Sequence, residues 1–162
     1  MLQTITFIIM TAYLIFQSIE DYKNMQVYVF PNNVILSYTI ISYLIEKIIV
    51  TKSIMMPFDA LMTVMAIIIL SLFHLYASGD MKALISIFFA LRYTVANTGT
   101  TVQEPNLFVF LIFLLITNTF FSITYIYRRI KQKGRCDKKM RVAYFPYLTI
   151  GYVLTSILFY VL

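Results

Sequence analysis

Long apolar stretches recur along this chain, and charged residues rarely interrupt them. Only 12% of the 162 residues are charged, whereas a soluble domain carries about a quarter. Each stretch is close to the roughly 20 residues that a helix needs to cross the hydrocarbon core of a bilayer. The sequence therefore predicts an all-α, polytopic membrane protein with about six transmembrane helices, forming one domain over residues 1–162. The predicted segments are Leu2–Ile19, Val34–Val50, Phe58–Tyr76, Met81–Thr98, Leu107–Tyr127 and Tyr144–Leu162.

The fourth segment is the least typical of the six, because Arg92 interrupts it. Lys82 and Arg92 lie ten residues apart, which corresponds to about 15 Å along a helix. Each of these long side chains is able to extend toward its own membrane interface. We therefore expect this segment to cross the membrane, and the predicted topology depends on that crossing.

Basic residues are concentrated in one part of the chain. Eight of the thirteen lie between Arg128 and Arg141, directly after the fifth segment. The positive-inside rule places this loop in the cytoplasm. With six crossings, the loops containing Lys23 and Lys82 face the same side, and both chain ends lie outside. A basic block beside apolar segments is typical of a loop that faces anionic lipid, so we expect membrane lipid as a partner and no nucleic acid.

This topology brings acidic residues from distant parts of the sequence to one membrane face. Asp21 lies just beyond the first segment and Asp80 just beyond the third, with Glu20 and Asp137 on the same side. Two carboxylates that lie close together do not both ionise readily, so one keeps a proton. The ionised group then accepts a proton from water, while the protonated group hydrogen-bonds to a carbonyl. Position alone favours ordinary solvated loop charges over a catalytic pair.

Other catalytic chemistries have less support in the sequence. His74 is the one histidine and Cys136 the one cysteine. A multi-residue zinc site, an internal disulfide and a serine–histidine triad therefore lack the residues they need. A Cys136–His74 pair would join a residue of an apolar segment to a thiol in the basic loop, without a supporting motif. We expect no metal and no cofactor.

Three short motifs follow one another along the chain. They are Asp21-Tyr22-Lys23 with Pro31-Asn32 at the start of the next segment, Ser78-Gly79-Asp80-Met81-Lys82 followed by Ala83-Leu84, and Pro146-Tyr147-Leu148 with Gly151. In this order they resemble the motifs of the prepilin peptidase (type IV leader peptidase) family of GxGD-type intramembrane aspartyl proteases. Three departures occur: Ala77 replaces the first glycine of GxGD, Phe30 replaces an isoleucine, and the stretch from Asp21 to Pro31 is longer than usual.

The resemblance implies that Asp21 and Asp80 are the catalytic pair, and it selects Asp21 rather than Glu20. It further implies an aspartic endopeptidase that removes the short leader peptide from prepilin-like precursors at the cytoplasmic face of the bacterial plasma membrane. The cysteine-rich insert of larger members is absent, which implies a minimal form without N-methyltransferase activity. Gly79 and Lys82 would support the site, by close backbone approach and by positioning Asp80. Their plainer interpretations are a helix-start glycine and an inside-facing lysine.

Two other functions fit the same sequence. The first is a non-catalytic membrane transport or assembly subunit, in which both aspartates are ordinary loop charges. The second is a GxGD-type protease related to presenilin or signal peptide peptidase. Those proteins carry a Tyr-Asp motif inside a helix, whereas Asp21 follows Glu20 and both aspartates lie at segment ends. That difference favours the prepilin peptidase resemblance.

Overall fold

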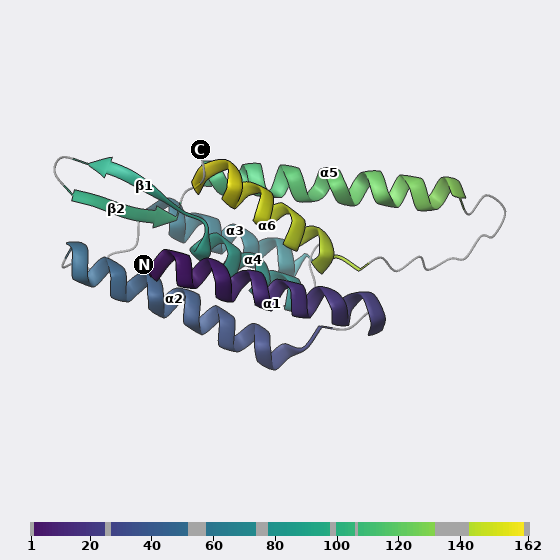
Figure 1. Cartoon of the computed structure of the whole chain (residues 1–162), viewed down its shortest axis with the longest axis horizontal. Helices are drawn as coiled ribbons and strands as arrows, with labels where there is room; N and C mark the ends of the chain where they lie inside the picture. Colours follow the sequence, from purple (N-terminus) through teal and green to yellow (C-terminus); the bar gives the residue numbers. More distant parts are fainter. Residues whose placement is uncertain are drawn as a thin grey trace.

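The computed structural model describes residues 2–24, 27–51, 58–73, 78–97, 100–105, 107–131 and 143–160. In this part of the chain it contains six helices and one two-stranded hairpin (Figure 1). The predicted helical architecture is confirmed, and the hairpin is an addition to it. The elements are α1 (Leu2–Asn24), α2 (Val29–Thr51), α3 (Phe58–Leu72), α4 (Ser78–Ala90), β1 (Arg92–Asn97), β2 (Thr100–Pro105), α5 (Leu107–Lys131) and α6 (Phe145–Tyr160).

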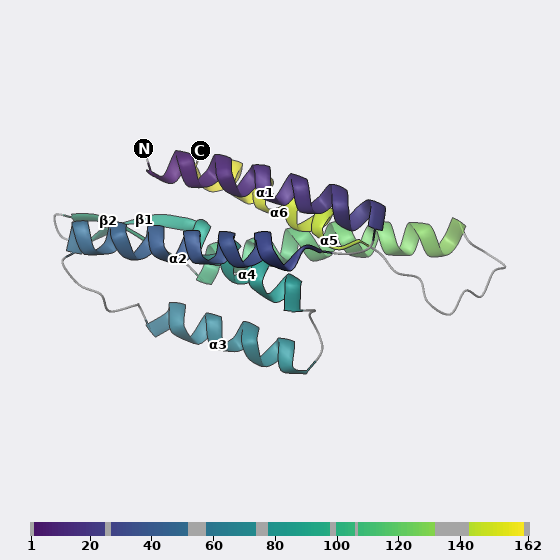
Figure 2. The ribbon, with the colours of Figure 1, turned by 90° about the horizontal axis from the view of Figure 1, so that it is seen from below.

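Successive helices run in alternating directions along the long axis of the molecule (Figures 1 and 2). The C-terminal ends of α1, α3 and α5 and the N-terminal ends of α2, α4 and α6 therefore lie at one end. We call this the aspartate end, because Asp21 lies in the last turn of α1 and Asp80 in the first turn of α4. The start of α1, the end of α6 and the hairpin lie toward the opposite end. The last turn of α5, with Arg128, Arg129 and Lys131, extends past the other helices at the aspartate end (Figure 1).

Residues 81–98, which the sequence predicts as one helix, divide into two elements. Helix α4 ends at Ala90, and β1 begins at Arg92 and pairs antiparallel with β2. The 13 residues of α4 rise by about 20 Å, less than the ~30 Å of a bilayer core. Tyr93, Thr94 and Val95 are aromatic or β-branched, and such residues favour strands. The chain still returns from the aspartate end toward the opposite end through α4 and β1 (Figure 2).

Helix α4 is the most enclosed element of the described chain. Every residue from Ala83 to Leu91 is buried, and α4 packs against α1, α2 and α3. Aromatic rings extend this packing outward, since Phe89 contacts Tyr43 of α2 and Phe88 contacts Phe110 of α5 edge-on. The core of the molecule therefore forms around a short helix that begins at Ser78, two residues before Asp80.

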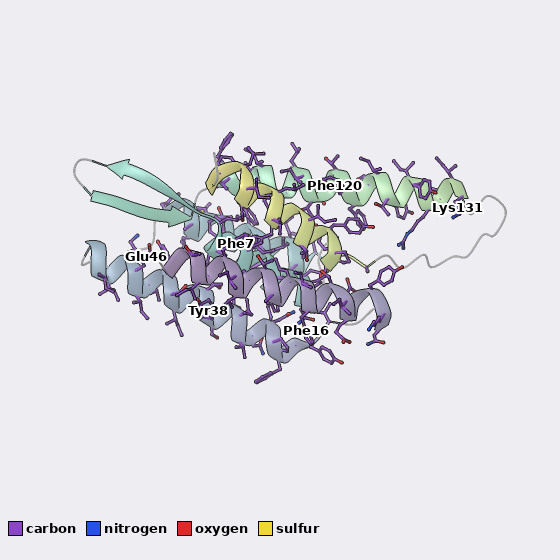
Figure 3. The ribbon with its side chains drawn as sticks, viewed as in Figure 1. Phe7, Phe16, Tyr38, Glu46, Phe120 and Lys131 are labelled. Atoms are coloured by element: carbon purple, nitrogen blue, oxygen red, sulfur yellow. The ribbon has the colours of Figure 1, made fainter. Side chains whose placement is uncertain are left out.

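The outer faces of α1, α2, α3, α5 and α6 carry large apolar side chains that are exposed. Phe30 is 78% exposed and Leu115 is 68% exposed, and Phe16 and Phe120, labelled in Figure 3, are also exposed. Among the described residues, one helix, α5, is long and apolar enough to cross a membrane by length and composition. Polar side chains lie inside instead, and those with at most 8% exposure include Gln17, Asp21, Asn32, Thr39, Ser42 and Ser86.

Candidate functional site

Asp21 connects the end of α1 to the start of α6. Asp21 is 8% exposed, and its Oδ2 accepts hydrogen bonds from the backbone N–H groups of Tyr144 (2.7 Å) and Phe145 (3.0 Å). The first N–H groups of a helix have no intrahelical partner, so an acceptor placed there caps the helix. The next residue, Pro146, has no N–H and lies in the first turn of α6, as its sequence position predicts. Asp21 therefore caps a helix that lies more than a hundred residues away in the sequence.

Asp21 belongs to a buried polar stripe on one face of α1. Tyr13, Gln17 and Asp21 are spaced by four residues, which places them on the same side of the helix. The Gln17 Nε2 donates to the Asn32 Oδ1 (2.9 Å) and to the Tyr28 carbonyl (3.1 Å), and its Oε1 accepts from the Tyr28 N–H (3.3 Å). The Tyr13 hydroxyl also donates to the Asn32 Oδ1. The stripe thus holds α1 against the start of α2.

Asp80 lies on the other side of this network, in the first turn of α4, and is half-buried. Its carboxylate is near enough to the Tyr13 phenol to interact with it electrostatically. Tyr13 precedes Asp21 by two helical turns, or about 12 Å along the axis of α1. The structure therefore brings both carboxylates to the aspartate end, as the predicted topology requires, but different neighbours engage them: α6 for Asp21 and Tyr13 for Asp80.

The two predicted supporting residues contact the first turn of α2. Gly79 is the second residue of α4, and its carbonyl accepts a hydrogen bond from the Asn32 Nδ2 (3.2 Å). Its backbone is helical, and a Cβ added there would lie 3.3 Å from that nitrogen, so the glycine permits a close approach. The Lys82 Nζ donates to the Asn33 Oδ1 (2.7 Å). Both residues thus hold α4 to α2.

Sequence reasoning missed three residues of this network: Tyr13, Gln17 and Asn32. Pro31 and Asn32 were both expected to mark the start of a helix. Pro31 does lie in the first turn of α2, whereas the Asn32 side chain is 1% exposed and makes three hydrogen bonds. The available signal was Gln17, an amide within an apolar segment, four residues before Asp21. A polar group at such a position needs a partner inside the protein.

A groove of about 550 Å³ runs between the C-terminal half of α1 and the N-terminal half of α6, next to the Asp21 cap. The Ser18 and Thr149 hydroxyls join the two helices there, 2.7 Å apart. Its walls are mostly apolar, which suits a hydrocarbon chain or an apolar helix. The lining residues are Ile15, Ser18, Ile19, Tyr22, Lys23, Pro146, Thr149 and Ile150.

The described residues contain no group of three or more His, Cys, Asp or Glu side chains that could hold a metal ion. His74, Cys136 and Asp137 lie outside the described residues. The side chains that the described site offers are the carboxylates of Asp21 and Asp80, the Tyr13 phenol, the amides of Gln17, Asn32 and Asn33, and the Lys82 ammonium.

Comparison of the chain with protein-family models, with curated proteins and with solved structures finds no match.

Proposed function

We propose that this protein is an intramembrane aspartic endopeptidase that removes the short leader peptide from prepilin-like precursors at the cytoplasmic face of a bacterial plasma membrane. The observation that carries the proposal is the common position of Asp21 and Asp80 at one end of the helical bundle. These are the residues to which the motif resemblance assigns the catalytic roles. One buried network, through Tyr13, Gln17 and Asn32, connects the helices that carry them.

A bilayer accounts for the distribution of polar and apolar side chains. Exposed apolar surface costs about 25 cal/mol per Å² in water, and lipid removes that cost. Gln17 of α1 and Thr39 and Ser42 of α2 find partners inside the bundle, as membrane helices require of buried polar groups. Helix α4 is too short to span but is enclosed by protein, where such a segment is tolerated. The basic last turn of α5 supports a cytoplasmic position for the aspartate end.

The proposed reaction needs only the two carboxylates and water. One carboxylate is ionised and takes a proton from the attacking water, whose oxygen bonds to the scissile carbonyl carbon. The other is protonated and donates a hydrogen bond to the carbonyl oxygen, which becomes negatively charged as the bond forms. Breakdown of this tetrahedral intermediate cleaves the C–N bond, and the departing amine receives a proton from a carboxyl group. The leader leaves, and the precursor's apolar helix stays in the membrane.

A non-catalytic transport or assembly subunit is the alternative, and one observation favours it. The Asp21 Oδ2 caps α6, and this role stabilises the fold without any catalysis. The two roles are compatible, because the Asp21 Oδ1 takes part in no hydrogen bond within the described part of the chain. A substitution that keeps the cap but removes the titratable group therefore separates them.

The test is co-expression with a candidate prepilin, comparing wild type with Asp21→Asn and Asp80→Asn. Each variant should lower cleavage by at least about 100-fold, the usual contribution of a general acid or base. Glu20→Gln is the matched control, because the Glu20 carboxylate is hydrogen-bonded only to the exposed Asn24 side chain among described residues, and it should retain cleavage. If Asp80→Asn still cleaves the precursor, the aspartyl mechanism is wrong. If the wild type itself does not cleave it, the non-catalytic alternative stands.

A further inference from the structure

Asn32 is the one side chain of the described network that contacts α1 and α4 at once. Its Oδ1 accepts hydrogen bonds from Tyr13 and Gln17 of α1, and its Nδ2 donates to the Gly79 carbonyl of α4. The side chain is 1% exposed, so water does not compete for these bonds. A buried amide that lost a partner would leave a polar group unpaired, which proteins rarely tolerate. The orientation of Asn32 is therefore determined from both sides.

The bond to Gly79 acts on a particular peptide unit. The Gly79 carbonyl and the Asp80 N–H belong to the same peptide plane, because the C–N bond does not rotate freely. Holding that carbonyl at 3.2 Å from the Asn32 Nδ2 restrains the plane and hence the direction in which the Asp80 side chain leaves the backbone. The contact lies at the first turn of α4. The first N–H groups of a helix have no intrahelical partner, so the helix's own hydrogen bonds restrain this turn less than later ones.

We infer that Asn32 is a positioning residue for Asp80, and that Tyr13 and Gln17 hold Asn32 in place for this role. The inference rests on the proposed function, since it gives Asp80 a geometry that matters for catalysis. It also explains why residue 79 is a glycine. A Cβ there would lie 3.3 Å from the Asn32 Nδ2, so a larger residue pushes the amide away from the carbonyl that it holds.

Asn32→Asp is the sharpest test, because it keeps the size and the acceptor for α1 but removes the N–H donor to Gly79. The turnover number kcat for precursor cleavage should fall by about 10- to 100-fold, since displacement of about 1 Å costs that much. KM should stay within about twofold, because Asn32 contacts the chain and not the substrate. Asn24→Asp is the matched control: it removes an amide donor from an exposed pair at the same end and should leave kcat unchanged.

Hydrogen–deuterium exchange of the detergent-solubilised protein gives a readout that does not depend on activity. In Asn32→Asp, amide exchange in residues 82–85, whose N–H groups bond to the first carbonyls of α4, should rise at least about tenfold, whereas exchange in the middle of α5 should stay as in wild type. Gly79→Ala disturbs the same contact without a new buried charge, so it keeps the test valid if Asn32→Asp does not fold. It should lower kcat and raise exchange at the start of α4 in the same pattern.

Wild-type kcat in both variants, or a raised KM with unchanged kcat, would overturn the positioning role. An exchange increase spread evenly over all helices would overturn it too, because Asn32 would then support the fold in general. Failure of the proposed function has a different signature: the wild type itself does not cleave the precursor. In that case local exchange at residues 82–85 still decides whether Asn32 holds the start of α4.

Discussion

Replacing Asp21 in two ways distinguishes its cap from its proposed catalytic role. Asp21→Asn keeps a side-chain oxygen that accepts from the Tyr144 and Phe145 N–H groups, and asparagine is as good a helix cap as aspartate. Asp21→Ala removes this acceptor, so the Tyr144 and Phe145 N–H groups at the start of α6 lose their hydrogen bonds to residue 21. Both variants lack the titratable group. They should therefore be equally inactive but differ in stability.

The size of the stability difference follows from the burial of the cap. Loss of a helix cap costs about 0.5–2 kcal/mol. Each of the two hydrogen bonds contributes about 0.5–1.5 kcal/mol net, and at 8% exposure of Asp21 water replaces them poorly. We therefore expect Asp21→Ala to lower the free energy of unfolding by about 2 kcal/mol. At about 2–4 °C per kcal/mol for a chain of this size, Tm should fall by about 4–8 °C.

The assay is thermal unfolding in one detergent, with precursor cleavage measured on the same preparations. Asp21→Asn should unfold within about 2 °C of the wild type, and only Asp21→Ala should show the larger decrease. Amide exchange at the start of α6 should rise in the alanine variant alone. An unchanged Tm in Asp21→Ala would mean that Asp21 does not cap α6 in the protein. Cleavage by Asp21→Asn at the wild-type rate would mean that the carboxylate does not act in catalysis.

Three further predictions concern packing, topology and the thiol. An added Cβ at Gly151 would overlap the Thr117 Oγ1 across the α5–α6 contact, so Gly151→Ala should lower the free energy of unfolding by about 1–3 kcal/mol. Adding Thr117→Ala should recover part of that loss, and additive effects in the double-mutant cycle would argue against the overlap. A reporter enzyme that works only in the cytoplasm should be active when it is fused after Lys82. A reporter that is active at this position only outside the cytoplasm would contradict the alternating topology. Cys136→Ser should cleave the precursor at the wild-type rate, whereas loss of cleavage at normal expression would indicate a thiol mechanism.

The helical segments were largely predictable because the information is local. An apolar run of about 20 residues satisfies its backbone hydrogen bonds most simply as a helix, whatever surrounds it. Proline in a first turn marked the starts of α2 and α6 correctly, since its missing N–H is not needed there. The position of Asp21 and Asp80 at one end also followed from the sequence, through the alternation of helices and the basic residues after the fifth segment.

The end of α4 was not predictable in the same way. Hydrophobicity continues past Ala90 at a level that suits a helix, a strand or a buried turn. The pairing of β1 with β2 supplies the hydrogen bonds that a longer helix would have supplied, and α1, α2 and α3 enclose the shortened helix. Whether the chain after Ala90 continues as a helix or becomes a strand therefore depends on residues from other parts of the chain.

The partners of the buried polar groups depended on the tertiary structure most strongly. Gln17 stands out in the sequence as an amide within an apolar segment, but its spacing does not identify Asn32 as its partner. Likewise, nothing in the sequence indicates that Asp21 accepts hydrogen bonds from the Tyr144 and Phe145 N–H groups. A hydrogen bond requires its donor and acceptor to lie within about 3 Å, and only the packing of helices from distant parts of the chain brings such groups that close.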